Sequence, residues 1–281
     1  MSESLVFRKP VKIEWLAETA KRLRGDAIKM VAGANSGHPG GSLSALDLIL
    51  TIYAYKLRFD AKNPKWEDRD RFVYSKGHAC PGFYAVLAEF GFFPKEEFKN
   101  FRKINSLLQG HSSVKIPGVE FSAGSLGQGL SYANGIAMAG KIDKKDYRVY
   151  CVLGDGELQE GQIWEAAMTS IKYKLDNLTL VIDRNKIQND DFVDKTKDLE
   201  PLANKWAAFG WDTAEIDGHN YKEIMDALDN AEFGKGRPSV IIAHTVKGKG
   251  VSFMENNPEY HGKAPSPEEL QKALKELGVS A

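Results

Sequence analysis

The sequence predicts an α/β fold with a mostly parallel central sheet and helices on both faces. Short apolar runs rich in Val, Ile and Leu alternate with segments whose apolar residues recur at helical spacing. Most clearly, the runs Val149–Leu153 and Leu178–Ile182 flank a segment in which Ile163, Ala167 and Ile171 share one helical face. A strand–helix–strand unit of this kind places two parallel strands in one sheet, joined by a right-handed crossover.

The N-terminal part of the chain is expected to form two helices around a glycine-rich loop. Apolar residues follow a helical period over residues 12–32. A second helix is expected to begin near Ser42 or Ser44, because either side chain could cap its first turn. His38 lies in the loop between these helices, among several glycines. A single histidine in such a loop is most often only a polar loop residue.

A second histidine follows the next predicted strand. Residues 71–75 form a short strand candidate that runs into a glycine-bearing turn with His78. Pro81 suits the first turn of a helix over residues 81–90. The free N–H groups and the dipole of a helix start favour anions. His78 could therefore donate a hydrogen bond to a phosphate oxygen at this position.

The alternation of helices and strands continues to the end of the chain. The remaining elements are expected as a short helical segment at 92–103, a helix of small residues after Gly129, a helix at 199–209, a strand at 211–216, a helix at 221–233, a central strand at 238–244 and a helix at 267–277. No internal repeat, linker or low-complexity segment divides them. One domain over residues 1–281 is therefore predicted.

The composition argues against several classes of protein. The 281 residues carry 38 basic and 38 acidic side chains, which gives no support for nucleic acid or an anionic membrane as partner. Cys80 and Cys151 have no CxxC neighbour, so neither a disulfide framework nor a zinc site is expected, and Cys151 should be a core residue. No apolar run reaches transmembrane length, and residues 1–10 lack the apolar segment of a signal peptide. We expect a cytoplasmic protein.

The two strands of the central unit end in residues that can hold a metal. Gly154, Asp155 and Gly156 follow the first strand, and Asn185 follows the second. Because the carboxyl ends of parallel strands share one edge of a sheet, Asp155 and Asn185 should point into one crevice. Their oxygens suit Mg²⁺ or Ca²⁺, and Mg²⁺ usually completes its shell with water and substrate phosphates. The pattern predicts a metal-dependent site for a phosphorylated ligand.

Gly-Asp-Gly alone is a common tight turn, but its surroundings favour a function. It is separated from Asn185 by 28 residues (157–184), as in the diphosphate-binding motif of thiamine diphosphate enzymes, which it resembles. His38, His78, His111 and His261 each adjoin a glycine in loop-like sequence. Imidazoles suit proton transfer near neutral pH. Neither a dinucleotide-binding GxGxxG in register nor a Walker A loop is present.

Taken together, these motifs resemble the N-terminal, diphosphate-binding part of the transketolase family. The matching blocks run in family order over residues 12–264: SGHPGGSLS, YSKGHACPG, LQGHSS, SAGSLGQGL, GDGELQEGQIWEA, DRNKIQ, HTVKGKGVSFMEN and YHGKAP. The resemblance implies the thiamine-diphosphate-binding fold and the transfer of a two-carbon ketol unit from a ketose phosphate to an aldose phosphate. In such chemistry the cofactor is the electron sink, while the protein orients it and moves protons.

The resemblance also implies a role for individual residues. The metal, Mg²⁺ or alternatively Ca²⁺, would be held by Asp155, Asn185 and the backbone carbonyl of Ile187. The catalytic residues would be His38, His111, His261 and Glu160, with the histidines facing the sugar and Glu160 in a carboxylate network between two active sites. The residues at the thiamine diphosphate would be His78, Gly124, Leu126, Gly154, Asp155, Gly156, Glu157, Asn185, Lys247 and His261, with the backbones of Gly124 and Leu126 at the pyrimidine.

Two local features depart from the family pattern. Ser112 follows His111, where the family commonly has proline, which affects the expected shape of the sugar pocket. Arg184 and Lys186 flank Asn185 with positive charge. This charge fits a nearby acidic ligand, but solvated surface charge is the simpler interpretation.

The resemblance further implies a partner. In whole transketolases the glutamate that activates the aminopyrimidine lies in a second domain, and no sequence follows Ala281 to supply it. The chain therefore resembles the N-terminal subunit of a split transketolase. A C-terminal subunit would supply the pyrimidine-binding domain and the catalytic glutamate, in a two-plus-two heterotetramer. An excised fragment of a longer enzyme is the alternative.

Two rival functions are compatible with the same cofactor motif. One is another thiamine diphosphate enzyme, such as 1-deoxyxylulose-5-phosphate synthase or a 2-oxo-acid dehydrogenase subunit. The HGK block at residues 261–263 and the several histidines favour a sugar over a 2-oxo acid. The other is a non-catalytic regulatory subunit, against which the intact Asp155, Asn185 and histidines argue.

Overall fold

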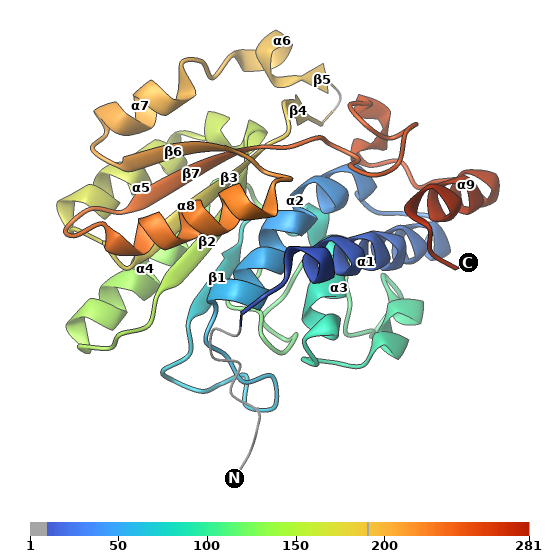
Figure 1. Cartoon of the computed structure of the whole chain (residues 1–281), viewed down its shortest axis with the longest axis horizontal. Coiled ribbons are helices and arrows are strands. Elements are labelled where there is room, and N and C mark those ends of the chain that lie inside the picture. The colour runs from blue at the N-terminus through green and yellow to red at the C-terminus, as the bar shows by residue number, and fades with distance from the viewer. Residues whose placement is uncertain (1–9, 190, 281) are drawn as a thin grey trace.

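The computed structural model describes residues 10–189 and 191–280 and is built around a five-stranded sheet (Figure 1). In spatial order the strands are β1 (Arg71–Tyr74), β2 (Val149–Gly154), β3 (Leu178–Arg184), β7 (Ser239–His244) and β6 (Asp212–Asp217). Every neighbouring pair in this sheet is parallel. The predicted fold class is confirmed, as are the pairing of β2 with β3 and the prediction that β7 is an interior strand with a neighbour on each side.

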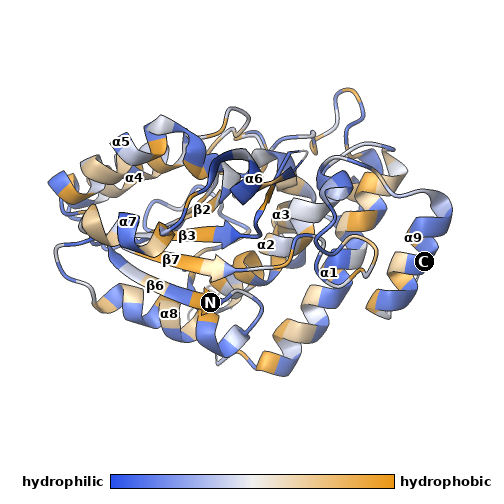
Figure 2. Cartoon of the chain, turned by 90° about the horizontal axis from the view of Figure 1, so that it is seen from above, coloured by the Kyte–Doolittle hydropathy of each residue, from blue (hydrophilic) through white to orange (hydrophobic). Residues whose placement is uncertain are grey.

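Helices cover both faces of the sheet. One face packs against α1 (Ile13–Gly33), α2 (Pro39–Thr51), α3 (Cys80–Glu89) and α8 (Tyr221–Phe233). The other packs against α4 (Gly129–Ile142), α5 (Gly161–Lys172) and α7 (Leu202–Ala208). Because both faces are covered, every residue of β2 and β3 is buried, and Cys151 lies in the core as predicted. Figure 2 shows the apolar strands β3 and β7 between the helices.

Smaller elements surround this framework. A two-stranded antiparallel unit of β4 (Ile187–Gln188) and β5 (Asp191–Phe192) follows β3 and leads into α6 (Val193–Lys197). The last helix, α9 (Pro267–Leu277), packs against α1. The helix predicted within residues 92–103 is only a short 3₁₀ segment, Lys95–Asn100. Residues 1–9, where no signal peptide is predicted, lie outside the described part of the chain.

The start of α2 differs from the prediction. The helix begins at Pro39, with His38 as its N-cap residue, and not near Ser42 or Ser44. Proline suits the first helical position because its φ is already helical and its missing N–H would be unpaired there. The Ser42 hydroxyl, which was expected to cap, instead donates to the His38 carbonyl oxygen at 2.7 Å. As a result, His38 is fixed at a helix start.

The strands also extend further than their apolar runs. β2 includes Gly154, and β3 includes Asp183 and Arg184, so that Gly154 pairs with Asp183 in the sheet. Polar residues are tolerated at these ends because the sheet there faces a cavity lined with partners of opposite charge. Within residues 10–189 and 191–280, no helix is both long enough and apolar enough to cross a membrane.

Candidate active site

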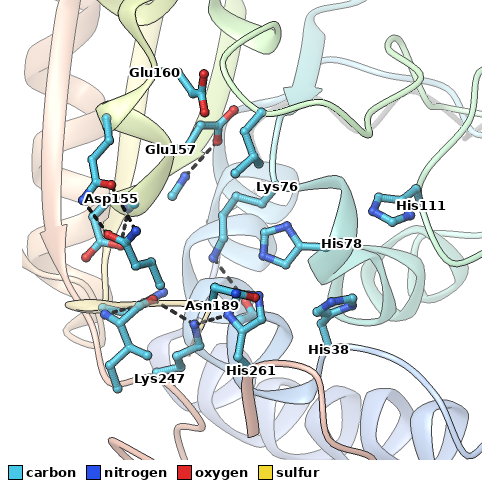
Figure 3. A pocket seen from close by; sticks show the side chains of 18 of the residues that line it. His38, Lys76, His78, His111, Asp155, Glu157, Glu160, Asn189, Lys247 and His261 are labelled. Atoms are coloured by element: carbon cyan, nitrogen blue, oxygen red, sulfur yellow. Dashed lines mark hydrogen bonds between the residues drawn. The ribbon is translucent and has the colours of Figure 1, made fainter. Parts of the chain in front are cut away.

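A cavity of about 370 Å³ lies at the carboxyl edge of the sheet (Figure 3). It is bounded by the ends of β2 and β3, the start of α2, the turn before α3, the loop over residues 109–127 and the segment after β7. The sequence-predicted site residues that line it are His38, His78, His111, Gly124, Leu126, Gly154, Asp155, Gly156, Glu157, Glu160, Asn185, Ile187, Lys247 and His261. The fold thus brings every one of them to a single cavity.

One end of the cavity presents oxygen atoms from the ends of β2 and β3. Asp155 Oδ1 accepts from the Gly156 N–H at 2.8 Å, and Oδ2 accepts from the Lys186 N–H at 2.5 Å. Asn185 Nδ2 donates to Asp183 at 3.1 Å, which leaves its Oδ1 to accept from the Ile187 N–H at 3.1 Å. These bonds fix the orientation of both the carboxylate and the amide. We call Asp155, Asn185 and Ile187 the oxygen-donor end.

The oxygen-donor end fits a hard divalent cation. Its donors are one carboxylate, one amide and one main-chain carbonyl, whereas no group of three His, Cys, Asp or Glu side chains in the described residues could hold a metal. Mg²⁺ typically uses one or two carboxylates together with substrate phosphates. Burial, and then the neighbouring Asp183, raise the pKa of Asp155 against the lowering effect of Arg184. A bound cation would favour the ionised carboxylate that this environment disfavours.

Asp183 is a buried residue next to the cavity. It was not singled out from the sequence. Its carboxylate is ion-paired with Lys76 and accepts from Thr245 and, at 2.7 Å, from Ser44. Burial disfavours the charged form, but the charge and hydrogen bond of Lys76 outweigh it and lower the pKa of Asp183. The pair joins the ends of β1, β3 and β7 to α2. The sequence signal for this ion pair was a lysine directly after a predicted short strand, in the block YSKGH.

Arg184 is not solvated surface charge, and that interpretation was wrong. Its side chain is only 5% exposed and contacts Asp155 at 3.2 Å and Glu200 at 2.8 Å. It is buried because β3 continues to this residue, so that the side chain lies against the sheet edge. Lys186, beyond the strand, is exposed as expected. Arg184 therefore helps to hold the Asp155 carboxylate in place.

The other end of the cavity gathers imidazoles from four separate segments. The His38 ring lies 5.2 Å from His78, 5.3 Å from His261 and 6.4 Å from His111, measured between ring centroids. Figure 3 shows these rings on the side of the cavity away from Asp155. Lys247 Nζ lies between the two ends, 2.7 Å from His261 Nδ1 and 2.8 Å from the Ile187 carbonyl oxygen to which it donates. We call the four histidines the imidazole end.

Burial controls the charge of these groups. Desolvation, with nearby cations, lowers the pKa of His38 to about 4 and that of His261 to about 3. Burial likewise lowers the pKa of His78 well below its usual value and that of Lys247 to about 7. The imidazoles are therefore neutral at physiological pH. Neutral imidazoles can both accept and donate hydrogen bonds at hydroxyl groups.

Two glutamates and a glycine-containing loop form the remaining wall. Glu157 is buried, and its carboxylate accepts from Ser75, from the Gly127 N–H at 3.0 Å and from the Gly154 N–H at 3.2 Å. It therefore braces the 109–127 loop against the end of β2. The Glu160 side chain is exposed at the cavity rim. Gly124 has open space where a Cβ would lie, which leaves its backbone accessible.

Sequence reasoning missed several residues of the cavity wall. They are Gly41, Lys76, Gln159, Gln188 and Asn189. Gln188 Nε2 donates to Gln159 Oε1 at 3.0 Å, and a Cβ on Gly156 would lie 2.6 Å from the Cβ of Gln188. Glycine at 156 is thus required for this close approach. Gln188 belongs to the block DRNKIQ, but nothing in the sequence alone indicated its contact with Gln159.

Comparison with known proteins gives a consistent result. Residues 16–281 match the family described as the thiamine diphosphate binding domain of transketolase. The chain is 39% identical over 267 residues to a subunit of the apulose-4-phosphate transketolase of Phocaeicola vulgatus, covering 95% of both chains. It is 40% identical over 263 residues to the 6-deoxy-6-sulfo-D-fructose transketolase subunit SqwG of Clostridium sp. (strain MSTE9), covering 93% of this chain and 96% of that one.

The fold comparison agrees with these relatives. The transketolase of Campylobacter jejuni superposes with a TM-score of 0.90 at 36% identity and covers 96% of this chain. This chain in turn spans only 44% of that enzyme. The chain therefore matches the two transketolase subunits along almost their whole length, but it spans less than half of the Campylobacter jejuni enzyme.

Proposed function

The chain belongs to the transketolase family as a transketolase subunit, and from this premise we propose that it binds thiamine diphosphate and, with a second polypeptide, transfers two-carbon ketol units between sugar phosphates. The observation that carries the proposal is the single cavity in which the oxygen-donor end and the imidazole end face one another. A phosphorylated cofactor and a polyhydroxylated substrate need these two chemistries side by side.

We assign the metal and the diphosphate to the oxygen-donor end. Asp155, Asn185 and the Ile187 carbonyl would hold Mg²⁺, with Ca²⁺ as the alternative metal. His78, Lys247 and the Gly156 main chain would face the diphosphate, where N–H groups could donate hydrogen bonds to its oxygens. When bound, the cofactor would supply the electron sink for cleavage of a carbon–carbon bond. The backbones of Gly124 and Leu126 would position its pyrimidine.

The substrate side belongs to the imidazole end. His38, His111 and His261 would bind the hydroxyl groups of the ketose and the aldose and move protons to and from them. Their lowered pKa values keep them neutral, so that each can accept a proton from a hydroxyl. Glu160, at the exposed rim, would contribute a carboxylate at the boundary with a neighbouring polypeptide.

We propose that a partner chain completes the cavity. Cofactor sites usually enclose most of their ligand, often between domains, whereas this cavity is open at the rim that carries Gly124 and Leu126. A C-terminal transketolase subunit would supply the pyrimidine-binding wall and the catalytic glutamate. The relatives that are themselves named as transketolase subunits match this chain along almost their whole length, which supports this arrangement. The interface should exceed about 2,000 Å², within a two-plus-two heterotetramer.

The experiment compares the isolated chain with the assembled enzyme. Ketol transfer from a ketose phosphate to an aldose phosphate is assayed with saturating thiamine diphosphate and Mg²⁺, first for this chain alone and then with increasing amounts of the partner chain. We expect no turnover from the chain alone and saturation near equal amounts. Full activity of the chain alone, with no increase on titration, would overturn the two-chain proposal. Turnover of pyruvate in place of the ketose would favour the synthase-like alternative.

A further inference from the structure

His219 lies outside the cavity, in the turn between β6 and α8, and is held by a buried ionic cluster. Its Nδ1 is 2.7 Å from Asp47 Oδ2, and the side chains of the two residues are only 11% and 4% exposed. Asp47 also accepts from Arg24 at 2.7 Å and from Tyr221 at 2.6 Å. The carboxylate is fixed by α1 and α8, and it fixes the imidazole in turn.

The opposite nitrogen of His219 determines its tautomer. The Val246 N–H donates to Nε2 at 2.8 Å. A main-chain N–H can only donate, so Nε2 must carry the lone pair and the ring proton must be on Nδ1. That proton is directed at Asp47. One neutral imidazole thereby connects the carboxylate on α2 to the main chain just after β7.

Val246 precedes Lys247, which lies between the two ends of the cavity. The sheet ends at His244, and beyond it the side chain of Thr245 contacts Asp183. Lys247 is only 2% exposed, and its amine reaches both the Ile187 carbonyl and His261. The main chain at Val246 therefore sets where this amine lies, and in the described structure its N–H bonds to His219.

We propose that His219 is a positioning residue that fixes the main chain at Val246 and so holds Lys247 at the diphosphate side of the cavity. The part concerning the diphosphate rests on the proposed function, whereas the part concerning Val246 and Lys247 does not. His219 is not among the residues that line the cavity. It acts only through the segment from Val246 to Lys247.

Three variants separate positioning from general stability. His219→Asn keeps a donor near Asp47 but lacks the acceptor for Val246, while His219→Gln offers an amide oxygen close to the place of Nε2. Tyr221→Phe is the matched control, because it removes another hydrogen bond from the same Asp47 and leaves Val246 untouched. Each folded variant is measured by hydrogen exchange of the Val246 amide, by acylation of Lys247 with an amine-directed reagent, and by calorimetric titration with thiamine diphosphate and Mg²⁺.

We expect His219→Asn to accelerate Val246 exchange and Lys247 acylation about tenfold or more and to weaken cofactor binding at least fivefold. His219→Gln should restore all three values to within about threefold, and Tyr221→Phe should leave them within about twofold. Unchanged exchange and acylation in His219→Asn would overturn the proposal, as would equal changes in Tyr221→Phe. If His219→Asn does not fold, His219→Gln serves as the test. Faster exchange of the Val246 amide in His219→Gln, with no faster acylation of Lys247, would then overturn the proposal.

The two proposals can fail separately. If the parent chain does not bind thiamine diphosphate, alone or with its partner chain, the proposed function fails. Val246 exchange and Lys247 acylation would still decide whether His219 holds this segment, because neither measurement needs the cofactor.

Discussion

The two ends of the cavity are built in different ways. The oxygen-donor end comes from two neighbouring strands, and Gly154 pairs directly with Asp183 in the sheet. Asp155 and Asn185 follow these paired residues, so the ladder of backbone hydrogen bonds sets their separation. The imidazole end has no such common support. His38 is the N-cap residue of α2, and His78 lies in the turn before α3. His111 lies in a loop, and His261 ends the 3₁₀ segment Pro258–His261.

The difference also appears in the electrostatics. At the oxygen-donor end, main-chain N–H groups and Arg184 hold a buried carboxylate in place. At the imidazole end, burial removes charge, and each ring stays neutral. We conclude that the first end is suited to holding charge and the second to exchanging protons. Substitutions at each end can separate these two roles.

Loss of the carboxylate should disable the oxygen-donor end alone. Asp155→Ala is expected to weaken metal-dependent binding of thiamine diphosphate by about 100-fold or more, about 2.8 kcal/mol, without unfolding the chain. The reason is that it removes the only carboxylate of the proposed ligand set. Calorimetric titration with Mg²⁺ and with a chelator measures the effect. Asp146→Ala, at a carboxylate that is 81% exposed on the surface, is the control. Unchanged affinity in Asp155→Ala would refute the assignment.

Changes at the imidazole end should separate turnover from cofactor binding. His38→Ala, His111→Ala and His261→Ala are expected to retain thiamine diphosphate but to lower kcat/KM for the sugars about tenfold or more in the assembled enzyme, since proton transfer is lost. His244→Ala is the matched control, because this histidine is 44% exposed and pairs with Glu215 away from the cavity. If two of the three site variants stay within about threefold of the parent, roughly 0.7 kcal/mol, the role is wrong.

The neutral imidazoles should make the cofactor-free chain sensitive to mild acid. His38 and His261 have folded pKa values of about 4 and about 3, against 6.5 when unfolded. Between these values the unfolded chain binds more protons, so the free energy of unfolding should fall as the pH drops from about 6.5 toward 4. Denaturant unfolding at a series of pH values measures this. The slope should be smaller in His38→Ala, and an identical slope in His38→Ala would contradict the prediction.

A separate effect is expected for Lys247, which lies between the two ends. Its pKa is lowered by burial from 10.5 to about 7, so the unfolded chain binds the proton more tightly across that range. The free energy of unfolding of the parent should therefore rise with pH between about 7 and 10. In Lys247→Met this rise should be reduced, and comparing unfolding of the two proteins at pH 7 and pH 9.5 tests it. Lys249→Met serves as a nearby control, and a parallel rise in Lys247→Met would exclude the burial effect.

Much of the oxygen-donor end could be predicted from the sequence. The period of apolar residues around Val149–Leu153 and Leu178–Ile182 predicts adjacent parallel strands, and parallel strands must place Asp155 and Asn185 at one edge. Glycines on either side of Asp155 further indicated a close approach of backbone and ligand. This information is local, since strand period and turn chemistry are carried by neighbouring residues.

Only the tertiary structure decided the rest. The sequence indicated which histidines to consider through their glycine neighbours, but not that four distant segments bring the His38 ring within 6.4 Å of the other three. It also gave no sign that Arg184 is buried or that His219 bonds to Val246, and for the pair of Lys76 with Asp183 it offered only a lysine after a strand. These contacts join residues far apart in the chain, and the charges are tolerated only because folding brings their partners into the same buried space. Local patterns therefore determined the strands and their ends, whereas the packing of separate segments determined the electrostatics between them.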